Sequence, residues 1–345
     1  MAILDITKLK DTVIQYDRTL RQLPVVQFRN VAQLLHINVM DLQGKHSLIL
    51  ERRRAGGTQS YATGKTFTAL EALLGYEPST IEPKDVVFIT KGNSQDYDDD
   101  RVILLQGSAV SNITKRHPLE LRVAMSMVSS FGEDLIYNMF HASRDTSGTT
   151  PAKAFDGFYT KIAALQTAGE LTAERGNLAT TGAIADPADD TDTNAYDTLV
   201  EFVADAHPLL RSSVGGKPQL LASQGVLKAA RAAYRNKVKS FQYPSLAQMV
   251  EALREDAFCP QLEVVTHEAL GTGSKLVLQK EGNIDFAFNT QAASRYIEIR
   301  NIYEDPNEWQ FWLQSGADTR IRDWHEKVFR TNEQANTALD LAGDY

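Results

Sequence analysis

The pattern nearest to a chemical motif is the run Ala62-Thr63-Gly64-Lys65-Thr66. Its Gly-Lys-Thr ending is typical of phosphate-binding loops, in which backbone N–H groups surround phosphates and the lysine contacts them. Such a loop also needs a glycine five residues before Gly64, where Gln59 stands, and a buried strand before it, where residues 52–54 are three arginines. The sequence therefore leaves a soluble phosphate-handling enzyme only as an alternative.

The sequence lacks other signatures of catalysis or metal binding. The acidic run at residues 96–100 lacks the glycine and the distal glutamate of a calcium-binding EF-hand loop. The seven histidines are scattered without an HExxH motif, and the single cysteine, Cys259, excludes an intrachain disulfide. No GxSxG or SxxK pattern organises a nucleophile. We therefore expect no enzyme activity, no catalytic residue, no metal and no cofactor.

Two short runs of opposite charge are more informative. The basic run is Arg52, Arg53 and Arg54, and the acidic run is Asp96, Asp98, Asp99 and Asp100. Each run could simply solvate a loop, because one exposed ion pair contributes only about 0–1 kcal/mol. A weak contact repeated at every interface of a lattice of subunits gains far more in total. We therefore hypothesise that these seven residues form an electrostatic contact between subunits.

Composition limits the class of protein. The chain has 345 residues, enough for about two domains, with 43% hydrophobic and 23% charged residues as in ordinary globular proteins. Its net charge of −8 argues against a dedicated nucleic-acid binder, whose surface is normally basic. The N-terminus carries no signal-peptide pattern, and no apolar run approaches the roughly 20 residues of a membrane helix. We expect synthesis in the cytoplasm.

A long helix is predicted over residues 118–142. Its apolar positions recur three, four or seven residues apart and so share one face. These positions are Leu121, Met125, Val128, Leu135 and Met139, with Phe131 and Ile136 beside them. At 1.5 Å per residue the helix would be roughly 37 Å long, about twice the usual globular helix. We expect the other segments to pack on it.

The segments before this helix have weaker patterns. Residues 9–20 and 25–35 indicate two short helices, or an arm lying on something else, because the apolar positions are too few to bury much within one chain. Residues 46–74 indicate a protruding hairpin that turns at residues 55–58 and ends in a short helix. Residues 85–90 predict a buried strand, and residues 102–105 another.

The segments after it alternate between helix and strand. Residues 154–167 predict an amphipathic helix that Gly169 caps, and residues 180–194 a polar surface loop. Ser223 is expected to cap a helix, and Ser245 with Gln248 forms a capping box for another. The further helices are expected at 199–207, 223–238 and 246–256, and the strands at 219–222, 262–267, 275–280 and 284–288. Tight turns are expected at residues 271–273 and 281–283.

The end of the chain predicts a β-meander that carries all three tryptophans. Its passes are residues 296–303, 309–313 and 319–329, with turns at 305–307 and 316–318.

The order of these segments resembles the tailed-bacteriophage major capsid protein of the Hong Kong 97-like fold. The long helix at residues 117–145 is similar to that family's spine helix, and the hairpin at residues 47–74 to its extended loop. The run Pro151-Ala-Lys-Ala-Phe-Asp-Gly-Phe158 is similar to the start of the axial domain, and residues 297–329 to the peripheral strands. The resemblance implies an α+β fold: an N-terminal arm, an extended loop, a long spine helix in a peripheral domain, and an α/β axial domain.

The resemblance also implies where these parts divide. The expected parts are an N-terminal arm (1–45), an extended loop (46–84), a peripheral domain with the spine helix (85–150), an axial domain (151–294), and peripheral strands with a C-terminal tail (295–345).

The function implied is structural. The chain would assemble with itself, as pentamers and hexamers, into the icosahedral shell of a tailed bacteriophage. The shell would enclose double-stranded DNA without binding it specifically, would not involve a membrane, and would assemble in the host cytoplasm to become part of the virion. Portal, scaffolding and decoration proteins are further partners that the resemblance allows. The shell of a cellular protein-cargo nanocompartment, which shares the fold, stays open as an alternative.

Overall fold

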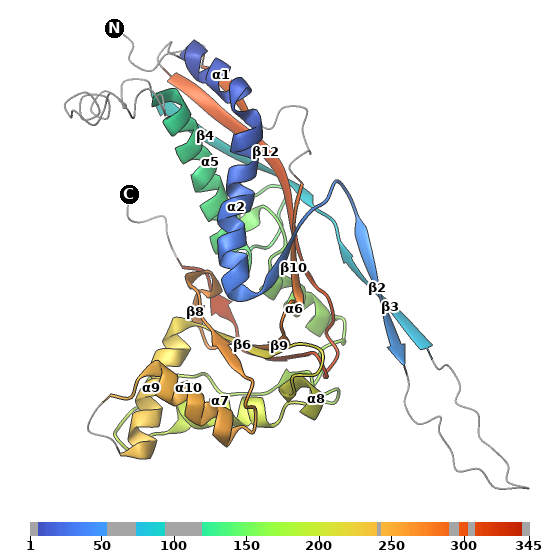
Figure 1. Ribbon diagram of the computed structural model, residues 1–345, viewed down its shortest axis with the longest axis vertical. Helices are drawn as coiled ribbons and strands as arrows, with labels where there is room; N and C mark the ends of the chain where they lie inside the picture. The colour runs from blue at the N-terminus through green and yellow to red at the C-terminus, as the bar shows by residue number, and fades with distance from the viewer. Residues whose placement is uncertain are drawn as a thin grey trace, which may run out of the picture.

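The chain folds around two β-sheets. The computed structural model describes residues 6–53, 74–93, 119–239, 243–289, 297–302 and 308–339. The first sheet has the order β1 (Ile37–Asp41), β10 (Ile284–Asn289), β12 (Glu308–Ile321), β11 (Ile297–Asn301), and β4 (Lys84–Asn93) also pairs with β12. The second sheet has the order β5 (Leu178–Ala179), β13 (Phe329–Asn332), β9 (Leu276–Lys280), β6 (Pro218–Ala222), β7 (Glu263–Val265). In Figure 1 the first sheet occupies the upper part of the molecule and the second the lower part.

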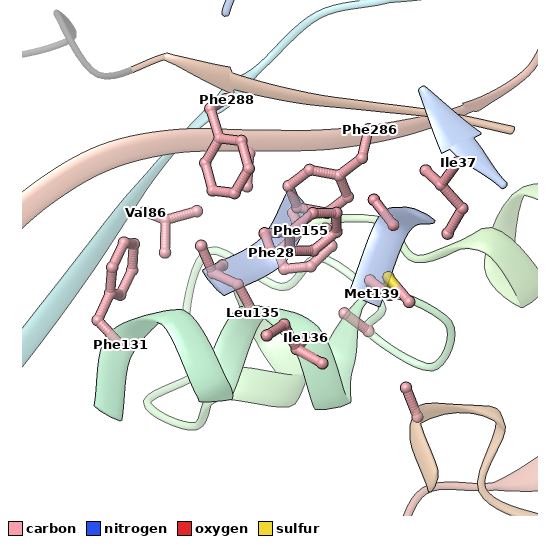
Figure 2. Packing of buried hydrophobic residues seen from close by; sticks show 14 of the residues in the cluster. Phe28, Ile37, Val86, Phe131, Leu135, Ile136, Met139, Phe155, Phe286 and Phe288 are labelled. Atoms are coloured by element: carbon pink, nitrogen blue, oxygen red, sulfur yellow. The ribbon is translucent and has the colours of Figure 1, made fainter. Parts of the chain in front are cut away.

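Three helices cover one side of the first sheet. They are α1 (Ile6–Gln15), α2 (Asp17–Leu35) and α5 (Leu119–Asn138). Phe28 of α2 stacks on Phe286 of β10 with ring centroids 4.1 Å apart, and Figure 2 shows Leu135, Ile136 and Met139 of the α5 segment directed into the same core. The helices α2 and α5 approach closely at Gly132, where a Cβ atom would lie 3.3 Å from the Pro24 backbone.

The N-terminal helices correct one expectation. Both are present, but Leu9, Leu20, Phe28 and Leu35 are completely buried within this chain. The prediction that this segment would bury little in its own subunit is therefore wrong. Its apolar residues looked sparse because each helix exposes a wide polar face and buries only a narrow stripe.

The long helix ends earlier than expected. Its apolar stripe is buried as predicted, with Met125 only partly buried. However, α5 stops at Asn138, whose side chain donates to the Asp134 carbonyl at 2.8 Å. The chain then folds back, and the Gly157 N–H donates to the Ala142 carbonyl at 2.7 Å. A Cβ atom on Gly157 would lie only 2.8 Å from the Ala142 nitrogen, so glycine is needed where the two segments cross.

The expected meander is wrong in its second turn. β12 runs straight through residues 316–318 as one strand of 14 residues, pairing with β11 in its first half, with β10 in its second, and with β4 along most of its length. Gly316 serves close packing here, since a Cβ atom would lie 2.8 Å from the Asn289 side chain. The expected third pass leaves this sheet, because β13 joins the second one.

Two other expected features also differ. The turn at residues 281–283 connects β9 of the second sheet to β10 of the first, so these strands do not form a hairpin. Residues 272–273 form β8 (Thr272–Gly273) and pair with β14 (Asn336–Thr337), so they are not a hairpin turn either. The strand β4 is present, but it is buried on one side: Val86 is 6% exposed, whereas Val87 and Ile89 are 42% and 47% exposed.

Helices pack around the second sheet to form a separate apolar cluster. They include α7 (Asn194–Ala204), α8 (Pro208–Arg211), α9 (Gln224–Val238) and α10 (Leu246–Asp256), while α6 (Phe158–Thr167) packs in the first cluster. Both predicted helix caps are confirmed here. The Ser223 hydroxyl accepts the Val226 N–H, and Ser245 with Gln248 forms the predicted capping box. None of the helices in the described ranges is long and apolar enough to cross a membrane.

Asp134 on α5 gives a pH-dependent prediction. Burial raises the pKa of its carboxyl from 3.8 to about 6, and the neighbouring Glu133 adds to this. A carboxyl whose pKa is higher in the folded state loses stabilisation as the pH rises through that folded value. We expect Asp134→Asn to be more stable than the wild type by about 1–2 kcal/mol at pH 8 and equally stable below about pH 4.

Urea unfolding at pH 4, 6 and 8 would measure this difference. The exposed Glu174→Gln substitution serves as the control, for which we expect no gain at pH 8. A gain of Asp134→Asn that is independent of pH would contradict the assignment.

Candidate functional site

The parts of the chain that the structure describes show no metal-binding cluster of histidine, cysteine and carboxylate side chains. The phosphate-loop-like run at residues 62–66 lies outside the described residues. The feature that stands apart from the body is instead a two-stranded ribbon, which we call the hairpin: β2 (His46–Arg53) and β3 (Leu74–Ile81), antiparallel with His46 opposite Ile81. Figure 1 shows it projecting well away from both sheets.

The hairpin has little apolar support of its own. A two-stranded ribbon is marginally stable alone, because it lacks a second layer to bury its side chains. Ile49 on β2 is 65% exposed, whereas Ile81, at the body end of β3, is completely buried. The first strand of the predicted hairpin is confirmed, whereas the second runs from Leu74 to Ile81, beyond the expected end of the hairpin at residue 74. The expected turn and short helix lie outside the described residues.

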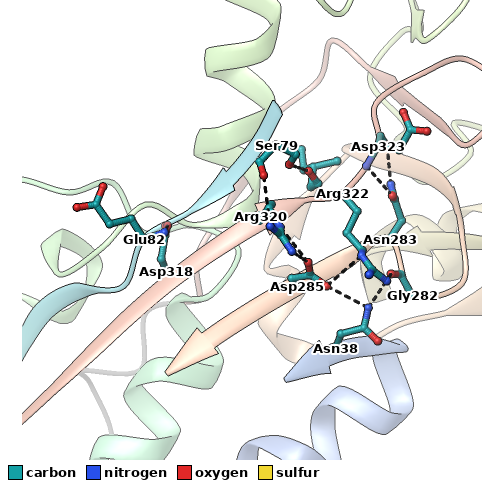
Figure 3. Close-up of polar contacts among 11 residues, drawn as sticks. Asn38, Ser79, Glu82, Gly282, Asn283, Asp285, Asp318, Arg320, Arg322 and Asp323 are labelled. Carbon is teal, nitrogen blue, oxygen red and sulfur yellow. Dashed lines mark hydrogen bonds and ion pairs between the residues drawn. The ribbon is translucent and has the colours of Figure 1, made fainter. Parts of the chain in front are cut away.

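Hydrogen bonds at its base attach the hairpin to the first sheet. The Ser79 hydroxyl of β3 donates to the Ile321 carbonyl of β12 at 2.7 Å, and Arg320 Nη1 donates to the Ser79 carbonyl at 3.3 Å. Ser79 is 4% exposed. Figure 3 shows Ser79 above the Arg320 side chain. The base of β3 is therefore fixed to β12 through both side-chain and backbone groups.

Arg320 is in turn held by a buried carboxylate. Its Nε donates to Asp285 Oδ2 at 2.9 Å, and its Nη2 contacts the same oxygen. The other oxygen of Asp285 accepts from Asn38 Nδ2 at 3.0 Å and lies 3.5 Å from Arg322 Nε. Arg320 and Asp285 are 3% and 1% exposed. This network, drawn in Figure 3, connects β1, β10, β12 and the hairpin.

A second attachment follows directly after β3. The buried Asp318 carboxylate accepts the Glu82 N–H at 2.8 Å and pairs with Lys161 Nζ at 3.1 Å. Burial raises the pKa of Asp318, while Lys161 opposes this shift. Glu82 itself pairs with Lys84 on the surface. The chain that leaves the hairpin is thus held to β12 at a further point.

The predicted charged runs are not brought together by these contacts. Arg52 and Arg53 lie at the outer end of β2, opposite Gly75 and Leu74. The remaining residues of the two runs, Arg54, Asp96, Asp98, Asp99 and Asp100, lie outside the described residues. Their contact between subunits stays a prediction.

Sequence reasoning missed the network around Arg320, although a signal was present. Asp285 stands between Ile284 and Phe286 in an apolar run, and Arg320 lies in the alternating run Thr319-Arg-Ile-Arg322. Charged residues are almost never fully buried unless they are paired. An acidic residue inside one predicted core strand and an arginine inside another therefore indicate a buried pair.

Comparisons with known proteins show the fold. No family model and no curated protein sequence matches the chain. Among solved structures, it is similar to a chain of the satellite phage P4 procapsid including size determination (Sid) protein, with a TM-score of 0.51 and 12% identity over 90% of this chain and 98% of that one. It is also similar to a chain of the capsid of Myoviridae phage XM1, with a TM-score of 0.50 and 11% identity over 88% and 90%.

These likenesses extend over nearly the whole of each chain at very low identity, so they concern the fold. The chain has the α+β fold of phage capsid proteins, the Hong Kong 97-like fold that the order of its sequence segments indicated.

Replacing Arg320 would test the network. Arg320→Met leaves the Asp285 carboxylate buried without its main partner, and we expect a loss of about 3–5 kcal/mol in the free energy of unfolding. Arg322→Met is the matched control: its side chain is 44% exposed and lies on the same strand beside the same carboxylate. We expect the control to lose less than about 1 kcal/mol.

Urea denaturation would measure both losses, and limited proteolysis would report on the base of the hairpin. The double variant Asp285→Leu with Arg320→Met removes both charges and should recover much of the loss. Equal losses in Arg320→Met and Arg322→Met would contradict the importance of the buried pair.

Proposed function

We propose that this chain is the shell-forming subunit of a viral capsid, the major capsid protein of a tailed double-stranded DNA bacteriophage, assembling as pentamers and hexamers. The observation that carries the proposal is its likeness to two phage capsid chains over 88–90% of its length. A similarity over that share of the chain supports a shared architecture rather than one common motif. The role is structural, and we propose no enzyme activity.

The hairpin supports self-assembly. It is fixed at its base by Ser79 and Arg320, yet Ile49, farther along β2, is 65% exposed. A ribbon of this kind gains stability when it lies on another surface. As the resemblance to the extended loop implies, we propose that this surface belongs to a neighbouring copy of the chain.

The first sheet offers an apolar surface that such a ribbon could cover. Phe88 of β4 points toward α5, where its ring lies 6.0 Å from Phe131. The neighbouring Val87 and Ile89 therefore lie on the opposite face, where both are exposed. Trp312 pairs with Ile89 on the same face, and Arg300 lies over its ring at 4.4 Å. An aromatic residue, an arginine and two aliphatic residues are typical of protein interfaces.

Charge and composition suit a shell. A net charge of −8 suits a protein that encloses DNA without binding it tightly. We propose the virion as its location, assembly in the host cytoplasm, and portal, scaffolding and decoration proteins as further partners. The boundaries expected at residues 45, 84, 150 and 294 belong to the same proposal.

Electron microscopy of the expressed protein tests the proposal directly. We expect closed shells or rings of five or six subunits, because the chain would bury its exposed hairpin and sheet face only against copies of itself. A stable monomer that does not assemble under any salt condition would contradict it. A peptide of a cellular cargo protein bound inside purified shells would instead favour a nanocompartment.

A charge exchange tests the predicted contact between subunits. We expect replacement of Arg52, Arg53 and Arg54 by glutamate to block or slow assembly, because it places like charges opposite the acidic run. Replacing Asp96, Asp98, Asp99 and Asp100 by lysine in the same chain should restore assembly.

Light scattering would follow assembly at low and high salt, since contacts between exposed charges weaken as salt rises. The wild type and the exchanged variant serve as controls for each other. Normal assembly of the arginine variant would contradict the contact.

A further inference from the structure

One histidine lies between the two sheets. His36 follows α2 and precedes β1, and it adopts a left-handed backbone conformation with φ of 51° and ψ of 43°. Its Nδ1 atom lies 3.0 Å from Glu281 Oε1, and its Nε2 atom lies 3.2 Å from Glu263 Oε1. Glu263 belongs to β7 of the second sheet. The ring therefore connects the first apolar cluster with the edge of the other sheet.

The second partner, Glu281, lies where the chain passes between the sheets. It begins the turn at residues 281–283 that connects β9 to β10. Asn38 Nδ2 donates to the Gly282 carbonyl at 2.8 Å, and Asn283 Nδ2 donates to the Asp323 carbonyl at 2.8 Å. These amide hydrogen bonds do not depend on pH. At the same place the two contacts of Glu263 and Glu281 are made to an imidazole ring.

The chemistry of the ring requires a proton for both contacts. A neutral imidazole carries one N–H, whereas an ionised carboxylate only accepts hydrogen bonds. A neutral His36 can therefore donate to Glu281 or to Glu263, and its other nitrogen then presents a lone pair to the remaining carboxylate. The imidazolium form donates to both. Histidine is the side chain that ordinarily changes charge between pH 5 and 8.

The neighbouring charges do not replace this contact. Lys280 Nζ is directed away, toward the Ser212 and Gly216 carbonyls. Arg322 contacts the Gly282 carbonyl at 3.4 Å and otherwise faces Asp285. Lys217 contacts this turn through its backbone carbonyl, which accepts the Glu281 N–H. Within the described ranges, the ion pairs of Glu263 and Glu281 are those with His36.

We infer that His36 is a pH-sensitive clamp between the two sheets. In its protonated form it holds both β7 and the connecting turn to the end of α2, and on losing the proton it releases one of them. The angle between the sheets would then be less restricted at higher pH. The consequence for a shell, a change in how sharply the subunit curves, rests on the proposed function, but the clamp itself does not.

Hydrogen exchange on the unassembled subunit tests the clamp. We expect the protection of residues 263–265 and 281–283, corrected for intrinsic exchange, to fall roughly two- to fivefold between pH 5.5 and pH 8, the scale of one partly exposed ion pair. His36→Asn should abolish this pH dependence, since asparagine tolerates the left-handed backbone but is too short to bridge the carboxylates. His46→Asn, at the exposed start of the hairpin, should behave like the wild type.

Two results would overturn the inference: pH-independent protection in the wild type, or an unchanged pH dependence in His36→Asn. If His36→Asn fails to fold, Glu281→Gln removes one carboxylate without altering the helix end and should reduce the pH dependence to about that of a single contact. The exchange experiment needs no assembly. The result for the clamp is therefore independent of whether the protein forms shells.

Discussion

Two opposite charges lie almost fully buried in the first sheet, Arg320 on β12 and Asp285 on β10. Neither could remain there without the other, because an unpaired buried charge is far less stable than the paired state. Their contact therefore restricts how β10 and β12 can align. Asn38 extends the restriction to β1, and Ser79 extends it to the hairpin. The direction in which the hairpin leaves the body thus depends on a polar contact inside the sheet.

The body of the molecule and the hairpin differ in how firmly they are packed. The body has two large apolar clusters, and close approaches at Gly132 and Gly157 leave little room for its helices and turns to move. By contrast, Ile49 of the hairpin and Val87 and Ile89 on the outer face of β4 are exposed. If the chain assembles as proposed, neighbouring copies would support this exposed projection. Assembly would then add stability where the single chain has least.

The sequence could predict what is decided locally. Helix starts at Ser223 and Ser245 were predictable because a hydroxyl near the first turn satisfies unpaired N–H groups whatever the tertiary structure. The first hairpin strand was predictable from an apolar run followed by turn residues, whereas β3 begins at Leu74, where the hairpin was expected to end. Strand partners were not, since residues 281–283 and 316–318 look like turns in isolation, and only pairing with distant strands decides that the first connects two sheets and the second continues β12.

The same distinction explains why the candidate site was found only in part. Charged runs such as residues 52–54 are visible in a sequence because they are contiguous. Asp285 and Arg320 are 35 positions apart, and only the folded structure shows that they form a buried pair. A protein that acts through many weak contacts needs no compact motif, because no single residue has to perform chemistry. The chain is similar in fold to two phage capsid chains at only 11–12% identity, so this fold can form with few residues in common.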